Sequence, residues 1–406
     1  MPTTAPPPPA TPESDTRRPA APPPPVIRNP NLHIIFCITL SAIMGVSSIT
    51  PILPMVASTF DITVGRAAML ITIFTLPGMV LTPVLGVLAD LIGRKKILVP
   101  SLLLFGLAGF ACSFAQSYEQ LLVFRFIQGI GAAAIGALNV TMVGDIFSGN
   151  QRNEAMGYNS AVLSIGATAY PAIGGALAVF GWYFPFYLPL FAVLVSLLVL
   201  FYLHNPEPRR MSSLRDYFRR VGRNLNNPRL LLLFASTLAS FIFLYGPVLT
   251  MIPFLVEQKF TDSSFYIGLL LSAVSIFNGA ASVSAGKLSK RFKTESLVKA
   301  SFFLYATALL LFPFMPGLYW LGIPVMLYGL GQGLNLPNLI TMITGEAELE
   351  NRAAIMSLNG MIIKIAQTVA PLAMSLLYAY AGFMAVYLFS TLLAAGVAIV
   401  LLLRLR

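Results

Sequence analysis

The stretch Gly86–Leu98, GVLADLIGRKKIL, joins the end of one apolar run of the chain to the start of the next. Its two glycines allow helices and a tight turn to approach closely. Its aspartate stands where the first run ends, and a carboxylate there can bond helix N-termini and basic groups in contacts that break and re-form. The simpler interpretation is a basic loop that flanks a membrane helix. We interpret the stretch as a conformational-switch loop formed by Gly86, Asp90, Gly93, Arg94 and Lys95.

Composition places the chain in a lipid bilayer. Of its 406 residues, 57% are hydrophobic and only 10% are charged, whereas ordinary globular domains carry about 25% charged residues. The net charge of +11 does not indicate a nucleic-acid partner, because the basic residues lie in short loops between apolar runs. The two cysteines, Cys37 and Cys112, give no disulfide framework or metal spacing. The sequence shows no catalytic triad or phosphate-binding loop, and we expect no enzyme activity, no cofactor and no metal.

Apolar runs of about 20 residues predict membrane helices, and we identify twelve. The first six lie near 32–57, 66–89, 97–115, 120–145, 153–180 and 183–203. The second six lie near 230–256, 265–287, 297–315, 318–342, 353–379 and 383–403. We therefore predict an all-α membrane protein with twelve transmembrane helices in two six-helix pseudo-symmetric halves around a central cavity. The predicted domains are a disordered Pro-rich cytoplasmic tail at 1–31, a bundle at 32–203, a cytoplasmic Arg-rich linker at 204–229 and a bundle at 230–406.

The basic residues predict the orientation in the membrane. Nearly all of the 26 lysines and arginines fall in the tail, the linker or loops on one side, and only Arg66 and Lys259 fall near loops on the other. The positive-inside rule therefore predicts that both termini are cytoplasmic. The short loops favour a multi-pass protein of a bacterial inner membrane, and a eukaryotic plasma membrane stays open.

An internal repeat supports the division into halves. When the sequence is shifted by 200 residues, special residues coincide in one unbroken register: Gly86 with Gly286, Gly129 with Gly329, Arg152 with Arg352, Asn159 with Asn359 and Pro171 with Pro371. Duplicated halves of membrane transporters enclose a site near the midplane and rock about it.

With these residues in place, the chain resembles the major facilitator superfamily, and within it the twelve-helix drug:proton antiporter branch. The loop Gly86–Lys96 matches the superfamily's loop between helices 2 and 3, although Leu91 stands where the family usually has a basic residue. The corresponding segment of the second half, Gly286–Arg291, lacks the aspartate. The segment 121–133, LLVFRFIQGIGAA, resembles the family's helix-4 motif, whose arginine, here Arg125, is implicated in proton coupling.

The fifth predicted helix follows the spacing of the family's antiporter motif, which marks exporters. Tyr170 departs from the pattern, which has glycine there. Glycine and proline allow a close, kinked helix contact that can seal one side of the cavity. The alternative is ordinary packing of small residues. The motif residues are Gly157, Gly166, Pro171, Gly174 and Gly175.

Two cations lie inside predicted helices, Arg125 and Lys364, and an ionisable residue in the membrane is a functional hypothesis by default. No carboxylate lies in the middle of a predicted helix. The cavity is therefore expected to be electropositive and to favour an organic anion over a lipophilic cation. The alternatives are an arginine that bonds backbone carbonyls and a lysine satisfied by neighbours such as Gln367.

Further polar groups can line such a cavity, with interhelical hydrogen bonding as the alternative for each. The pairs Asn335 and Asn338, and Lys364 and Gln367, each lie one turn apart and share a helix face. The candidates for substrate binding or proton coupling, beside the two cations, are Gln128, Tyr245, Asn278, Gln332, Asn335, Asn338, Asn359 and Gln367.

These features predict a secondary transporter that exports a small organic molecule, anionic or amphipathic, by proton antiport with alternating access. Proton coupling follows from the resemblance alone, with Lys364, Asp90 and Glu119 as candidate carriers. The alternatives are a multidrug exporter of lipophilic cations or neutral drugs, uniport or exchange, and a sensor with a transporter fold and no turnover. The expected partners are the substrate, protons and the bilayer, and we expect a monomer.

Overall fold

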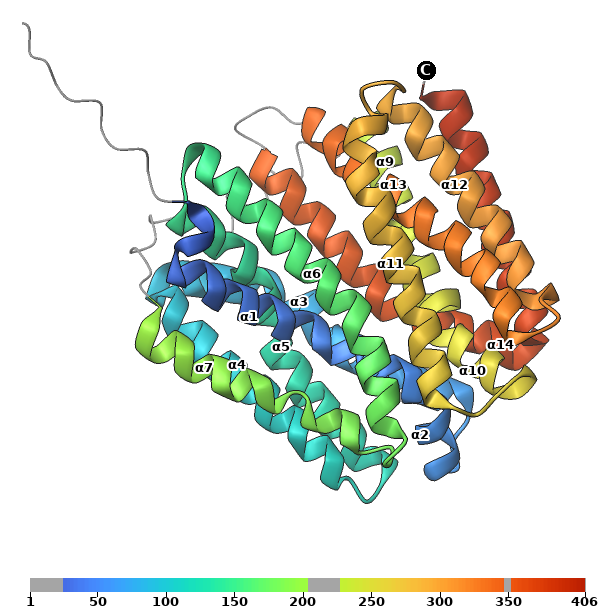
Figure 1. Ribbon diagram of the computed structural model, residues 1–406, viewed down its shortest axis with the longest axis horizontal. Coiled ribbons are helices and arrows are strands. Elements are labelled where there is room, and N and C mark those ends of the chain that lie inside the picture. The colour runs from blue at the N-terminus through green and yellow to red at the C-terminus, as the bar shows by residue number, and fades with distance from the viewer. Residues whose placement is uncertain (1–24, 204–226, 347–351, 406) are drawn as a thin grey trace, which may run out of the picture.

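The computed structural model describes residues 25–203, 227–346 and 352–405, and every regular element in these ranges is helical (Figure 1). Most of the predicted Pro-rich tail and Arg-rich linker lies outside the described residues. The predicted tail reached residue 31, but α1 begins at Pro30 because the Asn29 side chain accepts a hydrogen bond from the Asn31 amide and proline is suited to the first helical position. Asn227 and Pro228 begin α9 in the same way.

The first half of the chain forms helices from residue 30 to residue 202. Predicted helix 32–57 is interrupted in the structure at Thr50–Ile52 (η2), where prolines remove backbone donors. Thr63 and Ser117 cap the N-termini of α3 and α5 with side-chain oxygens. The helices are α1 Pro30–Ser47, α2 Leu53–Thr59, α3 Val64–Ile92, α4 Arg94–Ala111, α5 Tyr118–Ile146, α6 Gly149–Ala178 and α7 Leu190–Tyr202.

The second half runs from α9 to α14. Between α9 and α10 the chain forms a π-helix at Leu244–Met251 (η5), which contains Pro247. Two predicted spans fall within α14, which has a non-helical residue at Gly382 with φ 73°. The helices are α9 Pro228–Phe243, α10 Ile252–Lys259, α11 Ser264–Leu288, α12 Thr294–Leu311, α13 Gly322–Gly345 and α14 Arg352–Arg404.

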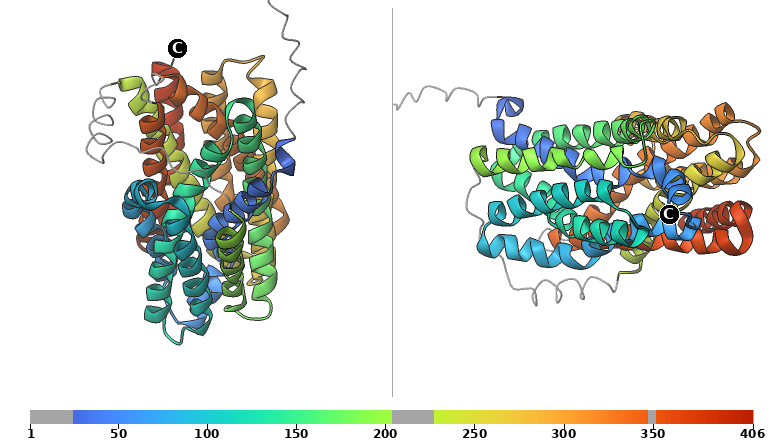
Figure 2. Two further views of the ribbon diagram at one scale, coloured as in Figure 1. Left: turned by 90° about the vertical axis from the view of Figure 1, so that its left-hand side faces the viewer. Right: turned by 90° about the horizontal axis from the view of Figure 1, so that it is seen from below.

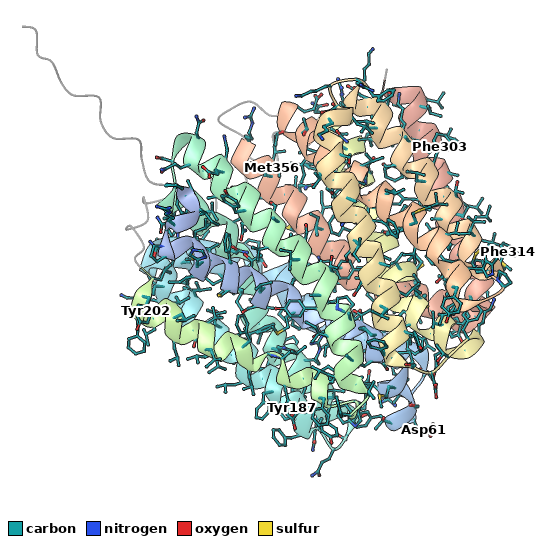
Figure 3. The ribbon with its side chains drawn as sticks, in the orientation of Figure 1. Asp61, Tyr187, Tyr202, Phe303, Phe314 and Met356 are labelled. Atoms are coloured by element: carbon teal, nitrogen blue, oxygen red, sulfur yellow. The ribbon has the colours of Figure 1, made fainter. Side chains whose placement is uncertain are left out.

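Among the described residues, ten helical segments are long and apolar enough to cross a membrane. The element α14, which includes the kink at Gly382, accounts for one of these segments, Ile355–Arg404. Large apolar side chains point outward from the bundle, among them Tyr202, Phe303 and Phe314 (Figure 3). An apolar outer surface of this kind is expected where helices face lipid tails.

Buried hydrophobic residues form two separate clusters. One is built from residues 26–203 together with Phe254, and the other from residues 230–405. The two bundles lie side by side in Figure 1 and in the right-hand view of Figure 2. They pack against each other chiefly through α6 on α11 and α3 on α14. We call these two contacts the seam.

Candidate functional site

The contact of α6 with α11 is close enough to require glycine. A Cβ on Gly175 would overlap the backbone of Ser264, and a Cβ on Gly268 would overlap the carbonyl of Pro171. The Ala172 amide donates to Ser272 Oγ across this contact at 3.1 Å. This end of the seam is therefore a close backbone-to-backbone contact.

Threonines join α3 to α14. Thr72 Oγ1 donates to the Thr368 carbonyl at 3.0 Å, and Thr368 Oγ1 bonds Thr75 Oγ1 at 3.1 Å. Thr75 Oγ1 also lies 3.4 Å from the Gln367 carbonyl. All three threonines are buried, so the two halves share a polar contact that excludes solvent.

Further along the same four helices, the seam opens. A Cβ on Gly86 of α3, Gly157 of α6, Gly286 of α11 or Gly360 of α14 would meet no heavy atom within 4 Å. All four glycines lie toward the end of the bundle that carries the α3–α4 turn at Gly93. The close glycine contacts of the seam therefore lie toward one end of these helices, and the four glycines toward the other end face open space. At the closed end, α2, α6, α10 and α11 enclose a pocket of about 410 Å³ whose lining includes Ser58, Glu257 and Asp262.

Lys364 lies where the closed part of the seam gives way to the open part. Its Nζ donates to Gln367 Oε1 at 3.1 Å, and Gln367 Nε2 donates to the Tyr245 hydroxyl at 3.0 Å. Its aliphatic chain passes Gly78 of α3, since a Cβ there would be 3.6 Å from Lys364 Cδ. An ammonium group has three N–H donors, so one protein acceptor leaves donors available for a ligand. We call Lys364, Gln367 and Tyr245 the seam triad.

The π-helix places Tyr245 in this triad. Thr250 Oγ1 donates to the Tyr245 carbonyl at 2.6 Å, which fits the i to i+5 spacing of the π-helical turn. Tyr387 donates to the Pro247 carbonyl at 3.2 Å and so bonds a carbonyl within the irregular segment. π-helical turns frequently occur at functional sites.

Arg125 lies away from the seam, fully buried in the first half. Its Nε donates to the Leu70 carbonyl at 3.2 Å, and its Nη1 donates to the Gly45 carbonyl at 2.9 Å and to Gln128 Oε1 at 2.8 Å. The guanidinium stacks 4.3 Å from the Phe74 ring centroid. This arrangement joins α1, α3 and α5, which is the structural role that the sequence left open for Arg125.

Gln332 and Asn335 occupy the interior of the second half. Tyr305 donates to Gln332 Oε1 at 2.5 Å, Asn335 Nδ2 donates to Ser240 Oγ at 2.5 Å, and Ser301 donates to Asn335 Oδ1 at 3.1 Å. All of these side chains are buried. They hold α9, α12 and α13 together.

The remaining predicted amides are also engaged within the second half or buried there. Asn338 Nδ2 donates to the Leu334 carbonyl of its own helix at 2.6 Å, and Asn278 Oδ1 accepts from Ser282 at 3.4 Å. Asn359 is buried, and its Oδ1 has no hydrogen-bond partner among the described residues. Among the predicted polar candidates in the described residues, hydrogen bonds therefore join two groups: Arg125 with Gln128 inside the first half, and Lys364 with Gln367 and Tyr245 at the seam.

The switch loop forms ion pairs inside the first half. Arg94, only 5% exposed, lies 2.9 Å from Asp90 and 2.6 Å from Asp145 of α5. Gly93 has φ 106°, a conformation that favours glycine. Lys95 Nζ bonds the Leu203 carbonyl beyond the end of α7 at 3.4 Å. In the described residues the loop therefore connects α3, α4, α5 and the end of α7.

The antiporter-motif residues occupy three different environments. Gly174 lies against the Ser48 carbonyl of the first helical segment, while Gly175 and Pro171 contact α11. Gly166 lies beside α1 side chains, and Gly157 faces open space. Tyr170 is buried where the resemblance expects glycine.

Sequence reasoning missed three contacts. It did not find Asp145 as the second partner of Arg94, the threonines of the α3–α14 contact, or the buried hydrogen bonds of Thr39 with Asn139 and Asn159. The repeated Asn159 and Asn359 gave a signal for the last contact. A threonine in an apolar helix gives none.

Comparison with known proteins establishes the family. The model of the Major Facilitator Superfamily matches residues 35–362 and 258–406, so the chain belongs to this superfamily of membrane transporters. It is 26% identical over 332 residues to the bacillibactin exporter of Bacillus subtilis (strain 168), covering 77% of this chain and 81% of that protein. It is 24% identical over 361 residues to the class B tetracycline resistance protein of Escherichia coli, covering 86% and 89%. The chain is thus a multi-pass membrane protein of the Major Facilitator Superfamily.

Solved structures share the fold. The nucleoside transporter NupG aligns with a TM-score of 0.78 at 13% identity, over 93% of this chain and 100% of that one. A bacterial homologue of the human lysosomal transporter Spinster, in an inward-facing and unoccupied conformation, aligns with a TM-score of 0.74 at 16% identity, over 94% and 96%.

Proposed function

We propose that the protein is a secondary transporter that exports a small organic molecule by alternating access. The observation that carries the proposal is the seam, which is closed by glycine and threonine contacts at one end and open at the other, with a polar triad between them. A site reached from one side at a time is what alternating access requires. The name of one relative, the bacillibactin exporter, supports export as the direction of transport.

The proposed architecture has twelve membrane spans in two six-helix halves. Separate hydrophobic clusters support the two halves, and the non-helical Gly382 supports counting α14 as two spans. We further propose that both termini face the cytoplasm of a bacterial cell, on the basis of the positive-inside rule. In that orientation the open end of the seam faces the cytoplasm.

The proposed substrate carries an acidic group that binds Lys364. Support comes from the geometry of the triad: the partly buried Lys364 has one described acceptor for its ammonium group, and Gly360, one turn earlier on α14, faces open space. Arg125 does not share this role, because it is fully enclosed by carbonyl, amide and ring contacts of the first half. The resemblance implies proton antiport, which is the coupling mode to be tested.

Transport into inside-out membrane vesicles tests this function. Vesicles containing the wild type, Lys364→Ala or Lys287→Ala are energised, and a panel of aromatic carboxylates and sulfonates is offered beside quaternary ammonium dyes. Lys287 is the matched control because it is an exposed lysine at the open end of α11. We expect acids to accumulate at least tenfold less with Lys364→Ala and normally with Lys287→Ala, and a protonophore to abolish accumulation.

The second candidate function is export of lipophilic cations. It is favoured if the dyes accumulate equally in the wild type and in Lys364→Ala, which would contradict the proposed role of the triad. Saturable binding of acids without accumulation would instead indicate a sensor that retains the transporter fold.

A further inference from the structure

The described membrane helices carry few charged side chains away from their ends, and these side chains lie in different parts of the molecule. In the described membrane-spanning helices, the ionisable side chains remote from both helix ends are Arg125 and Lys364, tyrosines and cysteines aside. Arg125 is fully buried within the first half, where its Nε and Nη1 donate three hydrogen bonds and its Nη2 has no partner among the described residues. Lys364 is consequently the one such cation at the seam.

The groups around Lys364 come from three elements. Helix α3 contributes Thr75 and Gly78, the π-helix contributes Tyr245, and α14 contributes Gln367. Threonine and glutamine do not titrate, and a phenol is neutral near pH 7. The described neighbours of Lys364 therefore offer no carboxylate or imidazole to exchange a proton for the substrate.

Because Lys364 is the titratable cation among these groups, its protonation determines how proton binding and substrate binding influence each other. A proton on Lys364 strengthens the binding of an anion, and by linkage a bound anion strengthens the binding of that proton. Antiport requires the opposite relation, in which the proton and the substrate compete for the site. If Lys364 lost its proton on each cycle, proton and anion would leave the cell together, against the proton gradient.

We infer that Lys364 stays cationic throughout the cycle and that the membrane potential drives export. This inference rests on the proposed function, an exporter of organic acids. The seam triad with a bound monoanion is neutral, and the empty triad carries one positive charge. An inside-negative potential favours the return of the empty, positive site to the cytoplasmic side, so each cycle moves one negative charge out. Such a cycle sustains an anion gradient of about 50-fold per 100 mV.

Transport assays with the full chain in proteoliposomes distinguish potential-driven export from proton antiport. The probes are aromatic sulfonates, which keep their negative charge at every pH used. Valinomycin with a potassium gradient sets a potential at equal pH, and in a parallel experiment a pH gradient is imposed with the potential clamped at zero. A potential-driven carrier moves the sulfonate toward the positive side whichever way it is inserted, and we expect this with no response to the pH gradient alone.

Substitution by arginine makes the test sharper, because arginine keeps its charge at every accessible pH. We expect Lys364→Arg to retain potential-driven transport within about tenfold of wild type, Lys364→Gln to lose it, and the Lys287→Gln control to be unchanged. Sulfonate transport that follows the pH gradient and ignores the potential would overturn the inference. If neither gradient moves any acid of the panel, the proposed function fails with it.

Discussion

Arg125 and Lys364 are both cations within membrane helices, and the structure places them in opposite situations. Arg125 has three hydrogen bonds and an aromatic ring on its guanidinium, all supplied by the first half. Lys364 has one described acceptor and lies between the halves. Arg125 is enclosed within one half, where its Nη2 has no partner among the described residues, so its contacts act on the fold; Lys364 lies between the halves, where a ligand can reach it.

The largest effect is expected from substituting the two cations, and it is an effect on the stability of the folded protein. Arg125→Leu leaves the carbonyls of Gly45 and Leu70 and the Gln128 side chain without their donor, at about 1–3 kcal/mol for each unsatisfied group. We expect the variant to lose most of its folded yield in detergent, whereas Lys364→Leu stays folded and loses transport. Thermal unfolding and gel filtration of the two purified variants measure the difference. Equal stability of both would remove the distinction between the two cations.

The sequence was sufficient to find both cations and the pairing of Lys364 with Gln367, since residues three apart share a helix face. It could not decide the role of Arg125, because the backbone carbonyls that surround it have no sequence signature. Tyr245 was one polar candidate among many, and its contact with Gln367 depends on a π-helix and on packing across 122 residues. The close contact that the fifth predicted helix implied is present at Gly174, against Ser48 at the end of α1, and at Gly175, against α11; neither partner was predicted.

A pair of glycines gives the next largest effect. Gly129 of α5 lies against the Phe74 carbonyl, beside the Arg125 stack, so a Cβ there would force backbone apart. Gly78 faces the flexible chain of Lys364 at 3.6 Å, an ordinary contact distance. We expect Gly129→Ala to lower stability by about 1–3 kcal/mol, as overpacking does, and Gly78→Ala to lower it by less than about 0.5 kcal/mol. Unfolding temperatures in the same detergent check this, and the reverse order would contradict the assignment.

The smallest effect compares two tyrosines that each bond a glutamine. Tyr305→Phe leaves Gln332 unpaired in the interior of the second half, and we expect a loss of about 1–3 kcal/mol in stability with transport otherwise intact. Tyr245→Phe removes the acceptor of Gln367 Nε2 at the seam, where both side chains are only partly buried and water can replace the lost bond. We expect its stability to change by less than about 0.5 kcal/mol. We expect its apparent affinity for acids to fall about threefold to tenfold, since the Tyr245 hydroxyl no longer fixes the Gln367 amide that positions the Lys364 ammonium group. Uptake measured over a range of substrate concentrations distinguishes this loss of affinity from a loss of maximal rate.

If the hydroxyl of Tyr245 only holds helices together, both tyrosine variants will lose stability and neither will change the affinity for acids.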